Sequence, residues 1–222
     1  MTRRRVGVLI SGRGSNLAAL IAAAQAPDYP AEIVLVVSNR PEAAGLAYAS
    51  EHGIASEIAD HKAFATKAEF EARLQAVLSV AGIELVCLAG FMRLLSGEFV
   101  ELWQNRIINI HPSLLPAFRG LDTHVRALAA GVCIHGATVH FVRPETDEGP
   151  IVAQAAVPVL PDDNAERLAA RVLRAEHRLY PMALRLVASG VARGVGERVV
   201  FDGRHLREPN AVLFSPAADQ ED

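Results

Sequence analysis

An Asn-x-His pair near the middle of the chain is the segment best suited to chemistry. In the run Ile107–Pro116, the apolar residues of an expected strand give way to Asn109 and His111, two positions apart. Because side chains alternate along a strand, both would lie on one face at its carboxyl end. Asn donates hydrogen bonds, and His can donate, accept or transfer a proton. The pair suits a reaction that develops an oxyanion and moves a proton, although a pair that only binds loop backbone explains the pattern about as well.

A third group could come from an acidic turn between two later β-rich segments. The turn Pro144–Pro150 carries Glu145, Asp147 and Glu148. A carboxylate beside a histidine favours the charged imidazolium and fixes the orientation of the ring. A solvated acidic turn is the more common explanation of such a segment, so both interpretations stay open.

A glycine-rich loop, Ser11–Asn16, falls between an expected strand and an expected helix. Backbone N–H groups at a helix N-terminus form an anion site, glycines let the anion approach, and Ser15 and Asn16 add donors. The third glycine of the dinucleotide fingerprint is replaced by Leu17, and residues 38–39 are Ser-Asn where an acidic ribose ligand is expected. No Gly-Lys-Ser/Thr occurs in the sequence. The loop therefore favours a single phosphate on a small substrate over NAD or ATP, with a ligand-free turn as the alternative.

These segments need elements that carry them to one edge of a sheet. Over the first two-thirds of the chain, short β-branched runs alternate with longer periodic runs rich in Ala and Leu. Strands are expected at 6–10, 33–37, 56–59, 85–89 and 106–110, and helices at 16–25, 42–52 and 67–81. This alternation predicts βαβ units and a mostly parallel sheet with helices on both faces. Ligands bind such sheets beyond the carboxyl ends of the strands.

The last third of the chain predicts an antiparallel extension and a long helix. Two β-rich runs at 136–142 and 151–159 flank the acidic turn, and a helix is expected at about 165–189. Pro181 should end or kink that helix near Tyr180.

The C-terminal part holds one further turn signal. Asp202-Gly203 predicts a hairpin turn within 199–206. Because no repeat and no long linker is found, we expect one domain at 1–208, followed by a frayed tail at 209–222.

Composition excludes several classes of protein. The chain has 222 residues, of which 51% are hydrophobic and 21% charged, so it can bury a core. A net charge of −3 gives no basic surplus for nucleic acid or an anionic membrane. The apolar runs are too short for a membrane span or a signal peptide. Cys87 and Cys133 are interpreted as thiols in a reducing compartment, although counting leaves one disulfide open. We expect a cytoplasmic monomer or homodimer without nucleic-acid or membrane partners.

Together the motifs resemble the phosphoribosylglycinamide formyltransferase family, the folate-dependent glycinamide ribonucleotide transformylases. The resemblance covers about Val6 to Leu206, and its motifs are Ile10–Asn16, Leu88–Leu95, Asn109–Pro116, Gly120–His124, Gly136–His140 and Asp147–Pro150. The Asn-x-His-x-Ser-x-Leu-Pro motif is shared by the wider formyltransferase superfamily, whereas the Gly-x-Gly-Ser-Asn loop points to this member. The resemblance implies a single-domain Rossmann-like formyltransferase fold, with 10-formyltetrahydrofolate as co-substrate and no metal.

The implied reaction moves the formyl group of the folate to the amine of 5'-phosphoribosylglycinamide. The products are formylglycinamide ribonucleotide and tetrahydrofolate, in purine (IMP) biosynthesis. Asn109 and protonated His111 would stabilise the tetrahedral oxyanion, and Asp147 would hold the ring. No covalent intermediate is needed, so Ser113 and the two Cys have no role as nucleophiles.

The resemblance also implies the site residues, with His140 close to the catalytic group Asn109, His111 and Asp147. The implied ribonucleotide-binding residues are Gly14, Ser15, Asn16, Leu173, Arg174, Ala175 and Glu176. The implied folate-binding residues are Lys67, Met92, Arg93, Leu94, Leu95, Asn109, Arg143, Pro144, Glu145, Thr146 and Asp147.

Two positions depart from the family pattern. Arg13 stands where the family often has a small or amide residue, and it would either add a phosphate contact or point to solvent. Lys67 stands where Arg commonly faces the folate tail; Lys keeps the charge but loses the bidentate fork.

Three other classes of protein share some of these features. A metal hydrolase could use His111, His124, His135 and His140, but neither His-Glu-x-x-His nor Cys-x-x-Cys spacing occurs. A methionyl-tRNA formyltransferase would carry a basic C-terminal domain, and a formyltetrahydrofolate deformylase would carry an N-terminal regulatory domain. A non-catalytic nucleotide-binding module explains the glycine loop but not the Asn109 and His111 pair.

Overall fold

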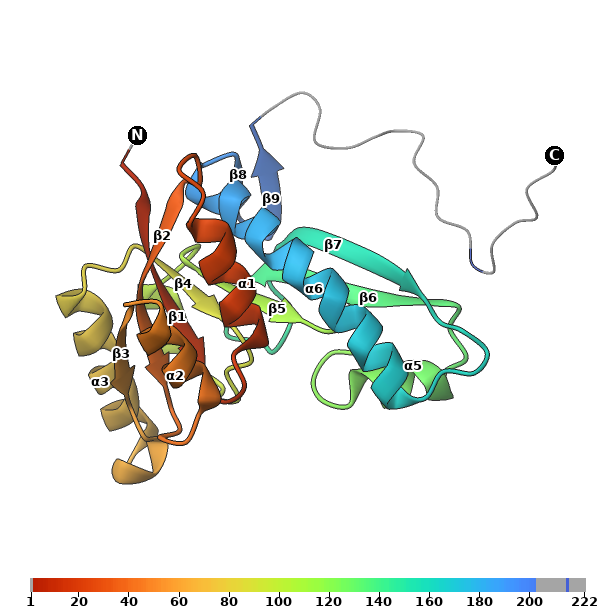
Figure 1. Cartoon of the computed structure of the whole chain (residues 1–222), viewed down its shortest axis with the longest axis horizontal. Helices are drawn as coiled ribbons and strands as arrows, with labels where there is room; N and C mark the ends of the chain where they lie inside the picture. Colours follow the sequence, from red (N-terminus) through yellow and green to blue (C-terminus); the bar gives the residue numbers. More distant parts are fainter. Residues whose placement is uncertain (1, 203–214, 216–222) are drawn as a thin grey trace.

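The computed structural model describes residues 2–202 and Ser215, and its centre is a seven-stranded sheet in the order β3-β2-β1-β4-β5-β6-β7 (Figure 1). The strands are β1 (Arg4–Ile10), β2 (Ala31–Ser38), β3 (Ala55–Ile58), β4 (Leu85–Leu88), β5 (Ile107–His111), β6 (Ile134–Phe141) and β7 (Ile151–Pro158). Strands β1 to β5 pair in parallel, and β6 and β7 extend the sheet in antiparallel. The predicted α/β fold with an antiparallel extension is confirmed.

Helices cover both faces of the sheet. They are α1 (Ser15–Ala24), α2 (Ala44–Glu51), α3 (Lys67–Val80), α4 (Gly97–Leu102), α5 (Thr123–Ala129) and α6 (Ala165–Ala188), with a 3₁₀ turn at His61–Ala63. Apolar residues of α1, α2, α5 and α6 pack in the core on one face, and those of α3 and α4 pack on the other. Because both faces are covered, the last five residues of β1 are all buried, which explains their unbroken apolar run.

The order of the strands positions the functional segments. Strands β1, β4 and β5 are parallel neighbours, so their carboxyl ends meet at one edge of the sheet. The glycine loop follows β1, the segment at 89–95 follows β4, and His111 ends β5. Three motifs that are far apart in the sequence therefore reach the same edge.

Helix α6 corrects one prediction. It does not end near Tyr180 but continues through Pro181 to Ala188. A proline inside a helix costs about 3 kcal/mol. Burial of Leu179 and Tyr180 before it and of Leu184 after it, at about 1.5–3 kcal/mol for each side chain, outweighs that cost. The Tyr29 hydroxyl also donates to the Pro181 carbonyl at 2.7 Å.

The structure contains a C-terminal hairpin that the sequence did not predict. Strands β8 (Ala192–Val195) and β9 (Arg198–Phe201) pair around a turn at 196–197, and the predicted turn at 202–203 reaches beyond the described residues. Gly196 has a positive φ of 56°, which is why the chain turns there. Gly203 lies outside the described residues, as does the expected tail at 209–222 apart from Ser215, so the domain boundaries stay predictions.

The sequence did not indicate the short helices α4 and α5, of six and seven residues, because neither is long enough to establish a period. Among the described helices, none is long and apolar enough to cross a membrane.

Candidate active site

The structure brings Asn109, His111 and Asp147 together, as the sequence predicted. Asn109 and His111 lie at the end of β5, and the turn after β6 carries Asp147 back over them. The His111 Nδ1 atom is 3.3 Å from Asp147 Oδ2, and these side chains are only 7% and 11% exposed. In such a site, water screens charge weakly.

Both ring nitrogens of His111 face oxygen atoms that can only accept. Nε2 lies 3.0 Å from the Phe118 carbonyl, and Nδ1 faces the Asp147 carboxylate. A carbonyl and an ionised carboxylate are both acceptors. This geometry therefore suits a ring with a proton on each nitrogen, which is the form that donates to an oxyanion.

The neighbouring His140 fixes the orientation of the Asn109 amide. Its Nδ1 atom lies 3.0 Å from the Phe141 carbonyl, so Nδ1 carries the proton and donates. Burial lowers the pKa of His140, an effect that this hydrogen bond and the Asp147 charge oppose. The neutral ring leaves Nε2 as an acceptor for Asn109 Nδ2 at 3.2 Å. Asn109 must therefore direct its NH₂ group, not its oxygen, toward His140, which leaves a second N–H for a ligand.

The Asp147 carboxylate is held by backbone as well as by His111. The Gly120 N–H donates to Asp147 Oδ2 at 2.9 Å. Asp147 has a positive φ of 57°, and two residues later a Cβ atom on Gly149 would lie 1.7 Å from the Phe141 carbonyl oxygen. The turn is thus folded tightly onto β6, and this fit fixes where the carboxylate lies.

Two polar residues that sequence reasoning missed hold the loop after His111, of which Thr138 is buried and Gln154 is exposed. Thr138 Oγ1 donates to the Ser113 carbonyl at 2.7 Å and accepts from the Leu115 N–H at 3.0 Å. Gln154 Nε2 donates to the Leu115 carbonyl at 2.9 Å and to Thr138 Oγ1 at 3.0 Å. Both residues lie on strands where polar side chains are expected to face solvent. Their one signal was a threonine within an otherwise apolar run.

The predicted ribonucleotide segments also meet. Asn16, at the start of α1, donates through Nδ2 to Glu176 Oε2 on α6 at 2.7 Å, although 160 positions separate them. Burial raises the pKa of Glu176, and the bond from Asn16 opposes that shift. The Asn16 Oδ1 atom is buried and has no hydrogen-bond partner among the described residues. Of the other predicted contacts on α6, Leu173 and Ala175 are half-buried and Arg174 is exposed.

Gly14 has a structural reason to be glycine. Its φ is 77°, and an added Cβ atom would lie 2.8 Å from the Cα atom of Gly45 at the start of α2. The side chains of the loop make no cap for α1, so its first N–H groups face outward. Ser15 is half-buried and Arg13 is exposed beside it.

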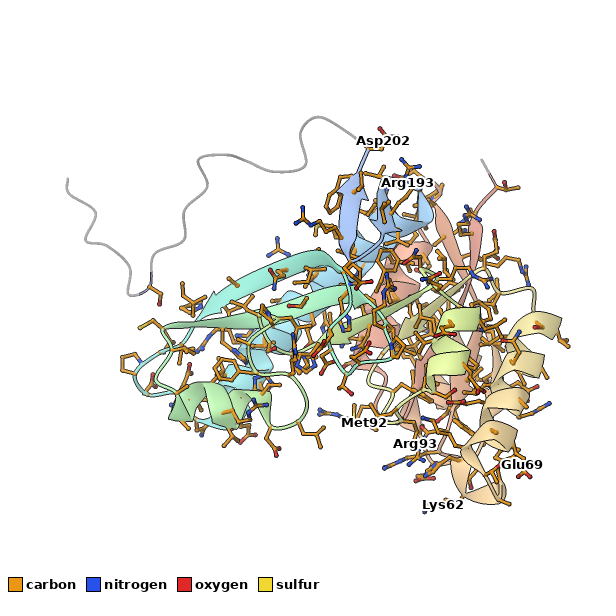
Figure 2. The ribbon with its side chains drawn as sticks, turned by 180° about the vertical axis from the view of Figure 1, so that it is seen from behind. Lys62, Glu69, Met92, Arg93, Arg193 and Asp202 are labelled. Atoms are coloured by element: carbon orange, nitrogen blue, oxygen red, sulfur yellow. The ribbon has the colours of Figure 1, made fainter. Side chains whose placement is uncertain are left out.

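The segment 92–95, which is predicted to form one wall of the folate site, follows β4. Met92 and Leu94 are 60% and 70% exposed, which is unusual for large apolar side chains next to a core strand. Met92 and Arg93 lie at the opposite end of the molecule from Asp202 (Figure 2). The Met92 N–H donates to Ser11 Oγ at 2.8 Å, which joins this wall to the glycine loop. Leu95 is half-buried.

A buried carboxylate binds Ser96, the residue that follows this wall. Glu71 on α3 accepts from the N–H of Ser96 at 2.6 Å and from its hydroxyl at 2.5 Å. Lys67 Nζ lies 3.9 Å from Glu71 Oε1 and is half exposed. The Lys67 amine is therefore accessible to solvent beside this buried carboxylate.

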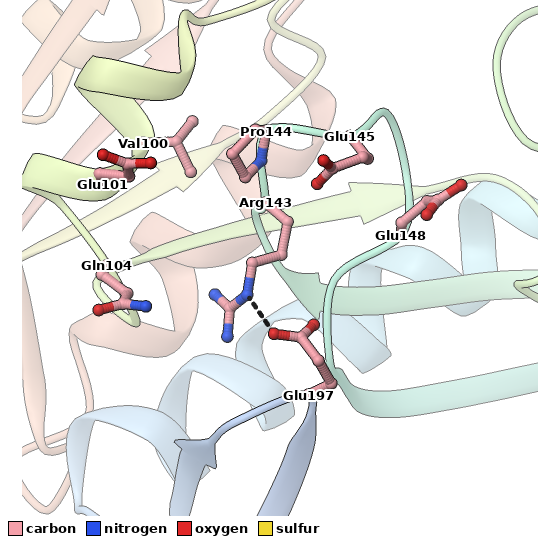
Figure 3. Close-up of a pocket in the computed structure, with 8 residues that line it drawn as sticks. All are labelled: Val100, Glu101, Gln104, Arg143, Pro144, Glu145, Glu148 and Glu197. Carbon is pink, nitrogen blue, oxygen red and sulfur yellow. Dashed lines mark hydrogen bonds and ion pairs between the residues drawn. The ribbon is translucent and has the colours of Figure 1, made fainter.

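The turn predicted to close over the pterin divides into two parts. Pro144, Glu145 and Thr146 are exposed, and Pro144 lies against Gly97 at the start of α4. Pro144 and Glu145 line a cavity of about 260 Å³ with residues of α4 and the β8–β9 hairpin (Figure 3). Arg143 is different, because its guanidinium binds Asn105 and the hairpin. A contribution from Arg143 to folate binding would come through its backbone.

Two further histidines lie behind the catalytic group. His124 and His135 pack edge to face with ring centroids 5.3 Å apart, and burial lowers the pKa of His135 to about 4. Among residues 2–202 and Ser215, no group of three or more His, Cys, Asp or Glu side chains is placed to hold a metal ion.

Comparison with known proteins gives a consistent result. Residues 4–184 match the family model described as formyl transferase. The chain is 52% identical over 193 residues to the trifunctional purine biosynthetic protein adenosine-3 of Gallus gallus, covering 87% of this chain and 19% of that protein. It is 38% identical to the phosphoribosylglycinamide formyltransferase of Haemophilus influenzae, covering 91% of this chain and 96% of that protein.

A solved structure agrees with these relatives. The crystal structure of phosphoribosylglycinamide formyltransferase from Brucella melitensis superposes with a TM-score of 0.82 at 58% identity, over 85% of this chain and 97% of that one. The chain thus spans nearly the whole of the single enzymes but about a fifth of the trifunctional protein.

Proposed function

Since this chain belongs to the formyl transferase family, we propose that it is a phosphoribosylglycinamide formyltransferase of purine biosynthesis. It transfers the formyl group of 10-formyltetrahydrofolate to the amine of 5'-phosphoribosylglycinamide. The products are formylglycinamide ribonucleotide and tetrahydrofolate. One observation carries the proposal: the amide of Asn109 and the ring of His111, both on β5, meet the carboxylate of Asp147 from a distant turn at one edge of the sheet.

The reaction begins when the amine of the ribonucleotide attacks the formyl carbon. The formyl oxygen becomes an oxyanion in the tetrahedral intermediate. The second N–H of Asn109 donates to it, since the first is committed to His140. One donor of this kind is worth about 3–4 kcal/mol in the barrier.

His111 supplies the second donor and a proton. Its Nε2–H exchanges the Phe118 carbonyl for the oxyanion when substrates bind. The attacking amine must lose a proton and N10 of the folate must gain one as the C–N bond breaks, so His111 or a water that it holds carries this proton. The Asp147 carboxylate, 3.3 Å from His111 Nδ1, holds the orientation of the ring throughout.

The two substrates approach from different sides. The phosphate binds the N-terminus of α1 at Gly14 and Ser15, while Asn16 and Glu176 face the glycinamide part. The pterin lies against 92–95, and the 144–147 turn covers it. Ser11 joins the two binding regions through its bond with the Met92 N–H.

A coupled assay tests the proposal, with both substrates present and tetrahydrofolate release followed spectroscopically. We expect release that requires the ribonucleotide. Release at the same rate without the ribonucleotide would instead mean hydrolysis of the formyl group, as a deformylase performs. If no tetrahydrofolate is released with or without the ribonucleotide, the protein would be a non-catalytic nucleotide-binding module.

The remaining expectations stay predictions. They are a cytoplasmic location, a monomer or homodimer, no nucleic-acid partner and catalysis without a metal. Metal analysis of the active protein and its sedimentation at assay concentration test two of them directly.

A further inference from the structure

The Arg143 side chain is almost fully buried by polar partners from three segments. Its guanidinium donates to Asn105 Oδ1 and to the Gly196 carbonyl, both at 3.0 Å, and to the Val142 carbonyl at 3.2 Å. A fourth N–H faces Glu197 Oε1 at 3.5 Å, and the side chain is only 10% exposed (Figure 3). Four of the five N–H groups of this arginine are therefore committed within the protein.

Asn105 completes the connection to the hairpin. It follows α4 with a positive φ of 56°, and its Nδ2 atom donates to the Gly194 carbonyl at 3.2 Å. Its Oδ1 atom accepts from Arg143, so both ends of the amide are occupied and its orientation is fixed. A Cβ atom on Gly194 would lie 2.5 Å from Asn105 Oδ1, so the hairpin fits closely against this amide.

The position of Arg143 in the chain gives this network a consequence for the candidate active site. Arg143 begins the turn whose fifth residue is Asp147, and Gly149 packs against Phe141 at the other end. Between these two ends, residues 144–146 are exposed. The contacts of Arg143 therefore hold the turn before Asp147, and the packing of Gly149 holds it after Asp147.

We propose that Arg143 is a positioning residue, which ties the turn that carries Asp147 to the β8–β9 hairpin and so sets where the Asp147 carboxylate meets His111. The hairpin at 192–201 lies beyond the region 4–184 that matches the family model. Its tie to Arg143 would give the hairpin a role in the site. The kinetic part of the inference rests on the proposed function. Its structural part does not.

The Gly120 amide offers a direct reporter of the Asp147 position. Its N–H donates to Asp147 Oδ2 at 2.9 Å, from a segment that Arg143 does not touch. If the turn shifts, this bond breaks and the amide exchanges its hydrogen faster. Amide-resolved hydrogen exchange therefore follows the carboxylate whether or not the enzyme turns over.

The test compares Arg143→Ala, Arg143→Lys and Asn105→Ala with the control Glu197→Gln. The control removes only the negative charge of a side chain that is 75% exposed, and it keeps the Gly196 carbonyl. We expect Arg143→Ala to lower kcat about tenfold, because displacements near 1 Å cost up to about 100-fold, with the KM for the ribonucleotide unchanged. Gly120 exchange should accelerate in Arg143→Ala and Asn105→Ala, recover in part in Arg143→Lys, and stay unchanged in Glu197→Gln.

Three outcomes would overturn the inference. One is Arg143→Ala that folds and keeps both kcat and Gly120 protection. Another is a raised KM for the folate at unchanged kcat, which would make Arg143 a folate ligand. The third is a loss of rate that matches the loss of folded protein in every variant. If the wild-type protein releases no tetrahydrofolate, the proposed function fails, and Gly120 exchange still decides the positioning role.

Discussion

Two regions of the molecule differ in how completely the protein satisfies their polar groups. They are the candidate catalytic cluster (Asn109, His111, His140 and Asp147) and the proposed substrate-binding edge (Ser11–Asn16 and 92–95). At the cluster, backbone or neighbouring side chains already bind His111, His140 and Asp147. At the binding edge, Asn16 keeps a buried oxygen without a partner among the described residues, and Met92 is 60% exposed. A site that stabilises developing charge works best when its donors are fixed beforehand, whereas a binding surface needs groups that the ligand satisfies. The difference predicts that changes at the cluster affect kcat and changes at the edge affect KM.

The largest effect is expected at His111. His111→Ala removes an oxyanion donor and the proton carrier, so kcat should fall by about 100–1,000-fold. The KM for the ribonucleotide should change little if, as proposed, the glycine loop binds its phosphate. Steady-state kinetics with each substrate varied in turn measure both constants. A raised KM at unchanged kcat would move His111 from the chemistry to binding.

A smaller loss of kcat is expected from His140. His140→Ala removes the acceptor that directs the Asn109 amide, so that Asn109 can turn its oxygen toward the substrate. We expect kcat to fall about 10–100-fold, below the full worth of one donor. His140→Gln is the matched variant, since its side-chain oxygen can accept from Asn109, and it should recover part of the rate. Equal losses in both variants would mean that His140 does not act through Asn109.

At the binding edge, Ser15→Ala is a better probe than a change at Gly14. Valine at Gly14 would meet the backbone of Gly45 and displace α2, so its effect would mix folding with binding. Ser15→Ala removes one phosphate donor, and we expect the KM for the ribonucleotide to rise about tenfold, as the loss of a charge-assisted bond predicts. The KM for the folate and kcat should stay within about twofold of wild type. A matching rise in the folate KM would contradict separate binding regions.

The smallest effect concerns stability rather than rate. The pKa of buried His135 is about 4, against 6.5 for an exposed histidine, so the unfolded chain binds a proton that the folded chain does not. Stability therefore falls as the pH decreases from 6.5 towards 4, by about 1–2 kcal/mol between pH 7.5 and 5. Urea unfolding at the two pH values measures this change, and His135→Gln should reduce it. An unchanged pH dependence in His135→Gln would assign the loss to other groups.

The sequence predicted the strands of the large sheet and the shared face of Asn109 and His111 because both rest on short-range patterns. Strand β1 is buried on both faces and reads as an apolar run, and the period of two in β5 brings Asn109 and His111 to one side. The roles of Thr138, Gln154 and Glu71 were not predictable. Each is a polar residue on a strand or helix whose partner lies in a distant segment, and no local period indicates such a contact.

At Pro181 and Arg143, a local sequence pattern indicates one role, and contacts with distant segments impose another. The proline rule is local, and burial of α6 against the sheet overrides it. Arg143 stands in the turn expected to close over the pterin, but the hairpin that binds its guanidinium begins about 50 residues later in the chain. Tertiary contacts of this kind decide what a side chain binds, and the adjacent residues in the sequence do not indicate them.

The most direct test of the cluster is a double-mutant cycle of His111 and Asp147. His111→Ala, Asp147→Asn and the double variant are compared with wild type by steady-state kcat for formyl transfer. If Asp147 acts only through the His111 ring, each single variant loses most of the rate and the double variant is about as slow as His111→Ala. Losses that multiply in the double variant would mean that the two residues act independently, and would contradict the claim that Asp147 acts through His111.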